Sequence, residues 1–191
     1  MSAQPYITFS DEQLIKVGNA AVYLTQRLGP LSKTKLLKLF YILDELAIKK
    51  SGIPFLNLTY KVWKFGPVSE ELFIDLSSDL KLLAGYLGKE IQEGDTYLKP
   101  LADFDDAEFS ENDIALMDDV VERFGQKTAK DLVAYTHREN SPWHTQAKAQ
   151  NVLHLLESEQ INNTEFAIDM SQLVVHDPRK LALYIAFKEQ H

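Results

Sequence analysis

The sequence predicts a mainly α-helical domain built around one central buried helix, with a small two-stranded antiparallel β ribbon. Apolar residues recur at helical spacing behind Ser, Thr or Asp residues that suit helix N-caps. Residues 32–51 are apolar around nearly the whole helix circumference, which is typical of a helix buried on all sides. Residues 60–65 alternate large apolar and basic side chains with the period of two expected of a strand.

The composition limits the classes of function. The chain has no cysteine, which excludes disulfides, thiolate nucleophiles and cysteine-ligated metal centres. Its formal net charge of −8 disfavours nucleic acid binding, because phosphates are normally held by clustered Lys and Arg. No apolar run approaches the roughly 20 residues that span a bilayer. We therefore expect one cytoplasmic domain over residues 1–191, with no cofactor, no nucleic acid and no membrane partner.

The chain is expected to begin with two helices, over residues 10–29 and 32–51. Ser10 and Ser32 each stand where a serine oxygen can accept hydrogen bonds from first-turn amides. The second helix is the central one. Three of its charged residues fall close to one stripe, which we interpret as a narrow solvated seam: Lys38, Glu45 and Lys49.

Residues 60–65 are expected to form one strand of the ribbon. Residues 96–99 are the nearest candidate for the antiparallel partner strand. Between them, Gly66-Pro67 is expected to begin a helix, because proline fits the first helical turn.

The segment 101–122 contains nine acidic side chains and no basic one. Ser110 suits the N-cap of a helix that ends at Gly125, so the acids are expected on its outer face and in the loop before it. Two interpretations stay open, a solvated helix face and a docking patch for a basic partner.

Four further helices are expected after residue 127. Thr128, Ser141 and Asp177 each suit an N-cap, and residues 152–159 have a helical pattern. Pro142 separates the second of these helices from the one before it. The last one, over residues 178–190, is amphipathic and can fold onto the core or pair with a second copy of the chain.

The sequence contains no familiar catalytic motif. The tightest cluster of metal-capable or acid-base side chains is His137, Glu139 and His144. A histidine hydrogen-bonded near a helix end is the simpler interpretation, and a small hydrolase or metal-assisted enzyme built on these three residues is the alternative. Trp63 and Trp143 lie beside chain reversals, where an indole anchors a turn to the core or contacts a partner.

Three stretches, in order, resemble the Panacea domain of the SocA-like antitoxins. The resemblance covers residues 10–150 and leaves 151–191 as a divergent C-terminal extension. The residues that carry it are Lys35, Lys38, Tyr41, Asp44, Trp63, Gly66, Pro67, Thr136, His137, Pro142 and Trp143.

The resemblance implies a bacterial or phage-encoded antitoxin that neutralises a cognate protein toxin by direct contact, without catalytic residues. The toxin is usually encoded by an adjacent gene. The alternative that the family implies is a proteolytic adaptor that delivers its toxin to a Clp protease. The surfaces that we consider for toxin contact are the basic, aromatic strand and the acid-rich stretch, with the candidate residues Tyr60, Lys64, Phe65, Asp118 and Asp119.

Overall fold

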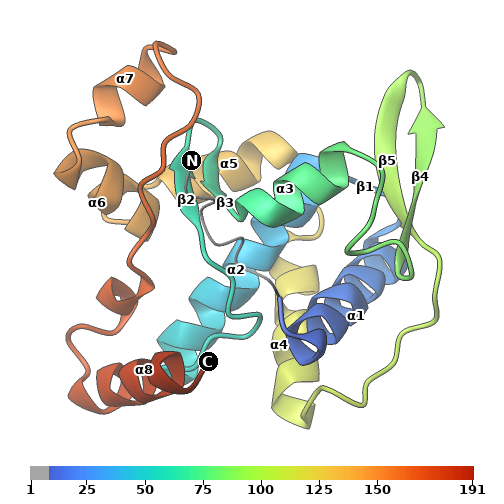
Figure 1. Cartoon of the computed structure of the whole chain (residues 1–191), viewed down its shortest axis with the longest axis horizontal. Helices are drawn as coiled ribbons and strands as arrows, with labels where there is room; N and C mark the ends of the chain where they lie inside the picture. Colours follow the sequence, from blue (N-terminus) through green and yellow to red (C-terminus); the bar gives the residue numbers. More distant parts are fainter. Residues whose placement is uncertain (1–8) are drawn as a thin grey trace, which may run out of the picture.

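The computed structural model describes residues 9–191, and this part of the chain is mainly α-helical with two small antiparallel sheets (Figure 1). The helices are α1 (Asp11–Leu28), α2 (Lys33–Ser51), α3 (Glu70–Ser77), α4 (Glu111–Phe124), α5 (Ala129–His137), α6 (Pro142–Ala149), α7 (Leu153–Glu157), the 3-10 helix η1 (Met170–Leu173) and α8 (Pro178–Gln190). The strands are β1 (Leu31–Ser32), β2 (Lys61–Trp63), β3 (Gly66–Val68), β4 (Leu87–Gln92) and β5 (Asp95–Pro100).

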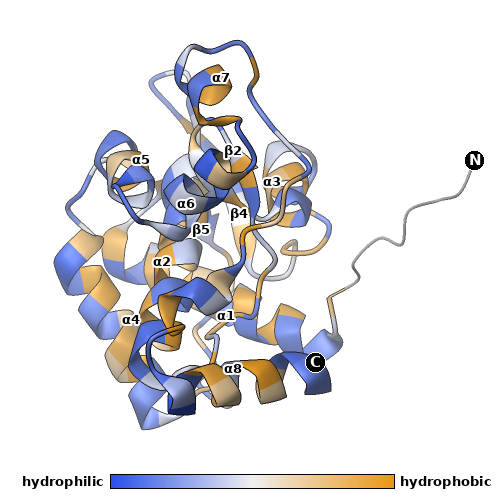
Figure 2. Cartoon of the chain, turned by 90° about the vertical axis from the view of Figure 1, so that its left-hand side faces the viewer, coloured by the Kyte–Doolittle hydropathy of each residue, from blue (hydrophilic) through white to orange (hydrophobic). Residues whose placement is uncertain are grey.

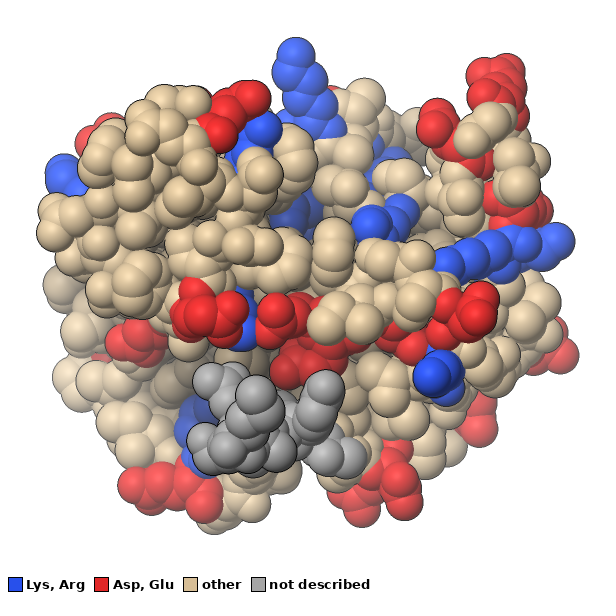
Figure 3. Space-filling view, turned by 45° about the horizontal axis from the view of Figure 1, so that its top comes forward, with Lys and Arg blue, Asp and Glu red and all other residues tan. Residues whose placement is uncertain are grey.

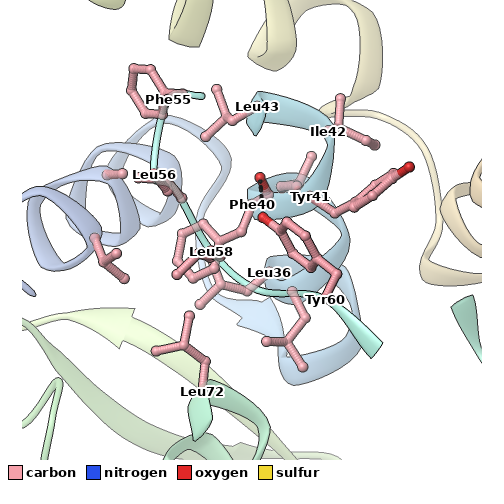
Figure 4. Packing of buried hydrophobic residues seen from close by; sticks show 14 of the residues in the cluster. Leu36, Phe40, Tyr41, Ile42, Leu43, Phe55, Leu56, Leu58, Tyr60 and Leu72 are labelled. Atoms are coloured by element: carbon pink, nitrogen blue, oxygen red, sulfur yellow. Dashed lines mark hydrogen bonds between the residues drawn. The ribbon is translucent and has the colours of Figure 1, made fainter. Parts of the chain in front are cut away.

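Helix α2 runs through the centre of the molecule, as its composition predicts (Figure 1). It packs against α3, α4, α5, α8, η1 and strand β3, so nearly all of its circumference meets another element. Figure 4 shows its side chains interleaved with those of the loop that follows it, Phe55, Leu56 and Leu58. Burying such side chains contributes about 1.5–3 kcal/mol each, which makes α2 and this loop the core of the fold.

The expected N-caps are confirmed. In each case the side-chain oxygen accepts a hydrogen bond from a backbone N–H in the first turn, which satisfies a group that the helix leaves without a partner. The capping residues are Ser10, Ser32, Ser110, Thr128, Ser141 and Asp177.

The expected ribbon exists, but the predicted pairing of 60–65 with 96–99 is wrong. Strand β2 pairs with β3, across a two-residue turn, and β5 pairs with β4 and β1. The expectation that Gly66-Pro67 begins a helix is wrong for the same reason, because both residues lie in β3 and α3 begins at Glu70. Gly66 has a φ of +94°, which a glycine adopts easily, and so closes a local hairpin. A local pairing also loses less loop entropy than one formed across thirty residues.

The expected solvated seam on α2 is wrong for two of its three residues. Lys38 and Glu45 are 1% and 0% exposed, whereas Lys49 is exposed. Helix α5 and the β2–β3 hairpin cover this face of α2. The charges therefore lie inside the protein and need compensation there.

The C-terminal part of the chain packs against the elements that precede it. Residues 162–168 run beside β2, where the Val62 amide donates to the Phe166 carbonyl and the Ile168 amide donates to the Tyr60 carbonyl. Helix α8 then packs on α2 but has no buried residue, and its Leu183 and Ile185 are exposed. Figure 2 shows that hydrophobic and hydrophilic residues mix along this helix. No helix in residues 9–191 is long and apolar enough to cross a membrane.

Candidate functional site

Asp44 organises the loop after α2. Its buried carboxylate accepts hydrogen bonds from the backbone amides of Leu56, Asn57 and Leu58 and from the Tyr60 hydroxyl, at 2.6–3.2 Å. Burial raises the pKa of Asp44, and these hydrogen bonds oppose that rise because they stabilise the charged form. The arrangement fixes the path of the chain from Gly52 to β2, which is a structural role.

Tyr60 belongs to this network and is only 2% exposed. Its ring packs edge-to-face on Tyr41 with 5.0 Å between centroids, among the residues that Figure 4 shows. The expectation that Tyr60 contacts a toxin is therefore wrong, because its side chain is committed to the core.

Lys38 is a buried lysine beneath the β2–β3 hairpin. Its Nζ donates to the Pro67 carbonyl at 2.7 Å, and no carboxylate pairs with it among residues 9–191. Burial lowers its pKa from 10.5 to about 7, because the charged amine loses its hydration without gaining a counter-ion.

The hairpin rests on α5 through Gly66. A Cβ added at Gly66 would lie 2.5 Å from Thr136 Oγ1, 3.1 Å from Lys38 Cε and 3.4 Å from His137 Nε2. Glycine is therefore required here twice, for its positive φ and for this close approach.

Helix α6 holds the hairpin from the other side. The indole of Trp143 donates from Nε1 to the Trp63 carbonyl at 2.9 Å, and its ring stacks on His137 with 3.7 Å between centroids. Burial lowers the pKa of His137 to about 4, with smaller contributions from the charges of Lys38 and His144. His137 is thus neutral near pH 7, and its buried Nε2 has no hydrogen-bond partner in the structure.

Glu45 is a fully buried carboxylate about two turns from Lys38 along α2. Its Oε1 accepts hydrogen bonds from Arg138, which closes over it, and from Lys49. The hydroxyl of Tyr135 lies 3.5 Å from the same oxygen. Two cations therefore compensate the buried charge, which ties the end of α5 to α2.

The residues that carry the family resemblance thus mostly build a scaffold. Lys38, Gly66 and Pro67, with Thr136, His137 and Trp143, converge where the hairpin meets α2, α5 and α6. Lys35 donates from Nζ to the Gly125 carbonyl and fixes the end of α4. Sequence periodicity does not reveal the burial of Lys38 and Glu45, because nothing in the sequence shows which elements cover that face.

The three residues of the enzyme alternative are only partly brought together. His137 and His144 lie close enough for the charge of one to affect the other, and Pro142 does separate their helices. Glu139 is exposed and has no hydrogen bond or ion pair with either histidine in the described chain. No group of three or more His, Asp or Glu residues within 9–191 has the arrangement of a metal site.

The acid-rich stretch is partly neutralised within the protein. Asp118 accepts hydrogen bonds from the Tyr23 hydroxyl at 2.5 Å and from Arg27 at 2.6 Å, and these bonds lower its pKa. Asp119 pairs with Arg123 at 2.8 Å. Figure 3 shows a row of acidic side chains across the middle of the visible face, with further acidic groups near its edges and basic side chains among them.

The hairpin turn is the exposed part of the basic, aromatic strand. Phe65 is 59% exposed at the turn. Lys64 forms an ion pair with Glu159 at 3.0 Å, and its Nζ lies 4.9 Å from the centre of the Phe65 ring. Phe65 is therefore accessible to a partner, whereas Lys64 is largely covered and paired with Glu159.

A larger groove lies at the opposite end of α2. It has a volume of about 970 Å³ and is lined by the start of α1, residues 53–57, the start of α4 and the end of α8. Its lining carries both signs of charge, such as Lys50, Lys188 and Glu12, so the groove favours no particular charge in a partner.

The comparisons with known proteins identify a family. A search of curated proteins and a search of solved structures each returned no match. The sequence model of the family described as "Antitoxin SocA-like, Panacea domain" matches residues 36–144, which run from the first turns of α2 to the start of α6. This range is more than half of the chain, and it contains the whole buried cluster around Lys38 and Gly66. The match confirms the resemblance seen in the sequence, and the chain therefore belongs to the SocA-like antitoxin family through its Panacea domain.

Proposed function

We propose that this protein is the antitoxin of a bacterial or phage toxin–antitoxin pair and that it neutralises a cognate protein toxin by binding it directly. The observation that carries the proposal is the family match over residues 36–144. The toxin is encoded by an adjacent gene, and the two proteins meet in the cytoplasm, which agrees with the absence of cysteine.

The placement of the signature residues supports binding by a surface rather than catalysis in a cleft. The polar groups of Asp44 and Lys38 are used to hold loops and the hairpin in place. Recognition then depends on exposed groups that this scaffold presents. Lys64 and Phe65 at the hairpin, and Asp118 and Asp119 on α4, are the two sets to test.

The inhibition that we propose is occlusion. A folded protein that covers the active surface of a toxin blocks access of its substrate without chemistry of its own. Complementary charge raises the rate of encounter, and buried aromatic anchors slow dissociation. This mechanism needs no cofactor and no protease.

The test is co-expression. Each open reading frame beside the gene is induced in bacteria with and without this protein, and the complex is then purified through a tag on this protein. Growth arrest that this protein relieves, with a stoichiometric complex recovered, is the expected result. Relief that needs a Clp protease, with loss of the toxin, would replace occlusion by delivery to the protease. The absence of any toxic neighbour would contradict the proposal.

A further inference from the structure

The β2–β3 turn carries an aromatic residue that the fold does not need. Trp63 pairs with Gly66, so Lys64 and Phe65 form a two-residue turn. Such turns usually contain Asn, Asp or Gly, which suit their backbone geometry. Phe65 instead exposes 59% of its surface to water, where an apolar ring contributes little to stability.

This aromatic residue is held rigidly. Trp143 donates to the carbonyl of Trp63 at the base of the turn, and the amide of Lys64 donates to the Asn162 carbonyl at 2.8 Å. The close contact of Gly66 with Thr136 fixes the turn from below. An exposed aromatic side chain on a rigid support loses little entropy on binding, as interface anchors require.

Beside the turn lies a small pit of about 50 Å³. The hairpin contributes Trp63 and Phe65 to its wall, α2 contributes Leu37 and Lys38, and α3 contributes Phe73. The rings of Trp63 and Phe73 meet edge-to-face at 4.9 Å and form one side of the wall. The pit has room for the end of one side chain.

The charge around this pit is positive, in a protein whose net charge is −8. Lys33, at the first position of α2, lies with its Nζ 4.1 Å from the centre of the Phe73 ring. Among residues 9–191, neither Lys33 nor Lys38 has a carboxylate partner, and the first turn of α2 contains no acid. The positive end of the α2 dipole adds to this charge.

The cations of the hairpin strand are balanced, which sets Lys33 and Lys38 apart. Lys61 pairs with Glu70 and Glu165, and Lys64 pairs with Glu159. Burial lowers the pKa of Lys33 as well, and the nearby charge of Lys89 lowers it further. A carboxylate supplied from outside would compensate Lys33, whereas Lys38 is 1% exposed and stays covered by the hairpin.

We propose that the surface formed by Lys33, Trp63, Lys64, Phe65 and Phe73, here named the hairpin face, is the docking site for an acidic segment of the toxin. One side chain of that segment enters the pit beside Phe65, and its carboxylates pair with Lys33. The identity of the partner rests on the proposed antitoxin function. The charge of the occupant is the new element, because the acid-rich α4 would instead select a basic partner.

The test uses the toxin that the co-expression experiment identifies. Its dissociation constant is measured by calorimetry for the wild-type antitoxin, for Phe65→Ala and for Lys33→Glu. Phe65→Ala is expected to weaken binding by at least about 30-fold, as truncation of an interface anchor does. Lys33→Glu is expected to weaken it by about tenfold at low salt, with a smaller difference at high salt.

Two matched variants serve as controls. Ile91→Ala removes an apolar side chain that is 78% exposed on β4, and Lys50→Glu reverses a lysine at the opposite end of α2. Both should bind the toxin like the wild type. Lys33→Glu places an acid at the positive end of the α2 dipole, which favours the helix, so lost binding would not reflect lost folding. Thermal unfolding of each variant confirms this.

The outcomes separate the docking site from the function. Suppose that the wild type neutralises a toxin encoded by an adjacent gene and that Phe65→Ala and Lys33→Glu bind this toxin with unchanged affinity. This result would overturn the proposed docking site and leave the proposed antitoxin function standing. A loss of the same size in the two controls would also overturn it. If the wild type neutralises no protein encoded by an adjacent gene, both the proposed function and the proposed docking site are wrong.

Discussion

The substitution Lys38→Met should stabilise the protein at low pH and destabilise it at high pH. Methionine has a similar length and no charge, so the variant removes the buried amine and its hydrogen bond to the Pro67 carbonyl. The folded-state pKa of Lys38 is lowered from 10.5 to about 7. Between these values the unfolded chain binds the proton and the folded protein does not, so wild-type stability rises with pH across this window.

The magnitude follows from the size of the shift. A fall from 10.5 to about 7 corresponds to about 5 kcal/mol at 1.36 kcal/mol per pH unit. The lost hydrogen bond leaves a buried carbonyl unpaired and costs Lys38→Met about 2 kcal/mol at every pH. The variant should therefore be more stable than the wild type by about 3 kcal/mol below pH 7 and less stable by about 2 kcal/mol above pH 10.

Urea unfolding followed by the fluorescence of Trp63 and Trp143, from about pH 6.5 to about pH 10, measures this difference. The difference between the two proteins isolates Lys38, because His137, whose pKa the charge of Lys38 also lowers, is neutral in the folded wild type over this pH range. Two curves that run parallel over the whole range would contradict this prediction, because they would mean that the lysine keeps its ordinary pKa when buried.

The contacts in the structure also predict the effects of three further substitutions on stability or binding. Gly66→Ala should destabilise the protein by about 3 kcal/mol, because the added methyl meets Thr136 Oγ1 and the backbone has a positive φ; an unchanged melting temperature would contradict this. Asp44→Asn should cost about 3 kcal/mol in urea unfolding, because an amide cannot accept all four hydrogen bonds of the carboxylate. Reversing Asp118 and Asp119 to Lys should lower stability only modestly in urea unfolding, because both ion pairs are exposed and the main loss is the acceptor of the Tyr23 hydroxyl. The same double variant should keep its affinity for the toxin if the hairpin face is the docking site, and a salt-dependent loss in calorimetry would move that site to α4.

The helix boundaries were largely predictable, because capping is local. Ser110 and Thr128 each stand three residues before an aspartate, and both capping boxes form as that spacing predicts. The burial of α2 was also predictable, since its apolar residues leave no polar face wide enough for water.

The hairpin pairing was not predictable from local signals. Its turn contains Lys64 and Phe65 in place of Asn-Gly, so the usual sequence mark of a tight hairpin is missing. The alternation of apolar and basic residues predicted strand β2 correctly, but it does not indicate which strand pairs with β2. A proline one residue after Gly66 also favours a helix start more often than an edge strand.

The buried charges were missed for a different reason. Helical spacing shows that Lys38 and Glu45 share a face of α2, but not that α5 and the hairpin cover it. Burial of Lys38 lowers stability near neutral pH, because its charged form loses hydration without a counter-ion. The exposed Phe65 is likewise not a residue that folding alone favours at a tight turn.

A titration of the purified toxin with the purified antitoxin decides between occlusion and the other mechanisms. The activity of the toxin is followed without any protease as increasing amounts of antitoxin are added. Direct binding predicts that the activity falls to zero at a stoichiometric ratio and that the two proteins co-elute. A toxin that stays active when saturated with antitoxin would contradict the account, and activity lost only when a Clp protease and ATP are added would assign the protein to delivery instead.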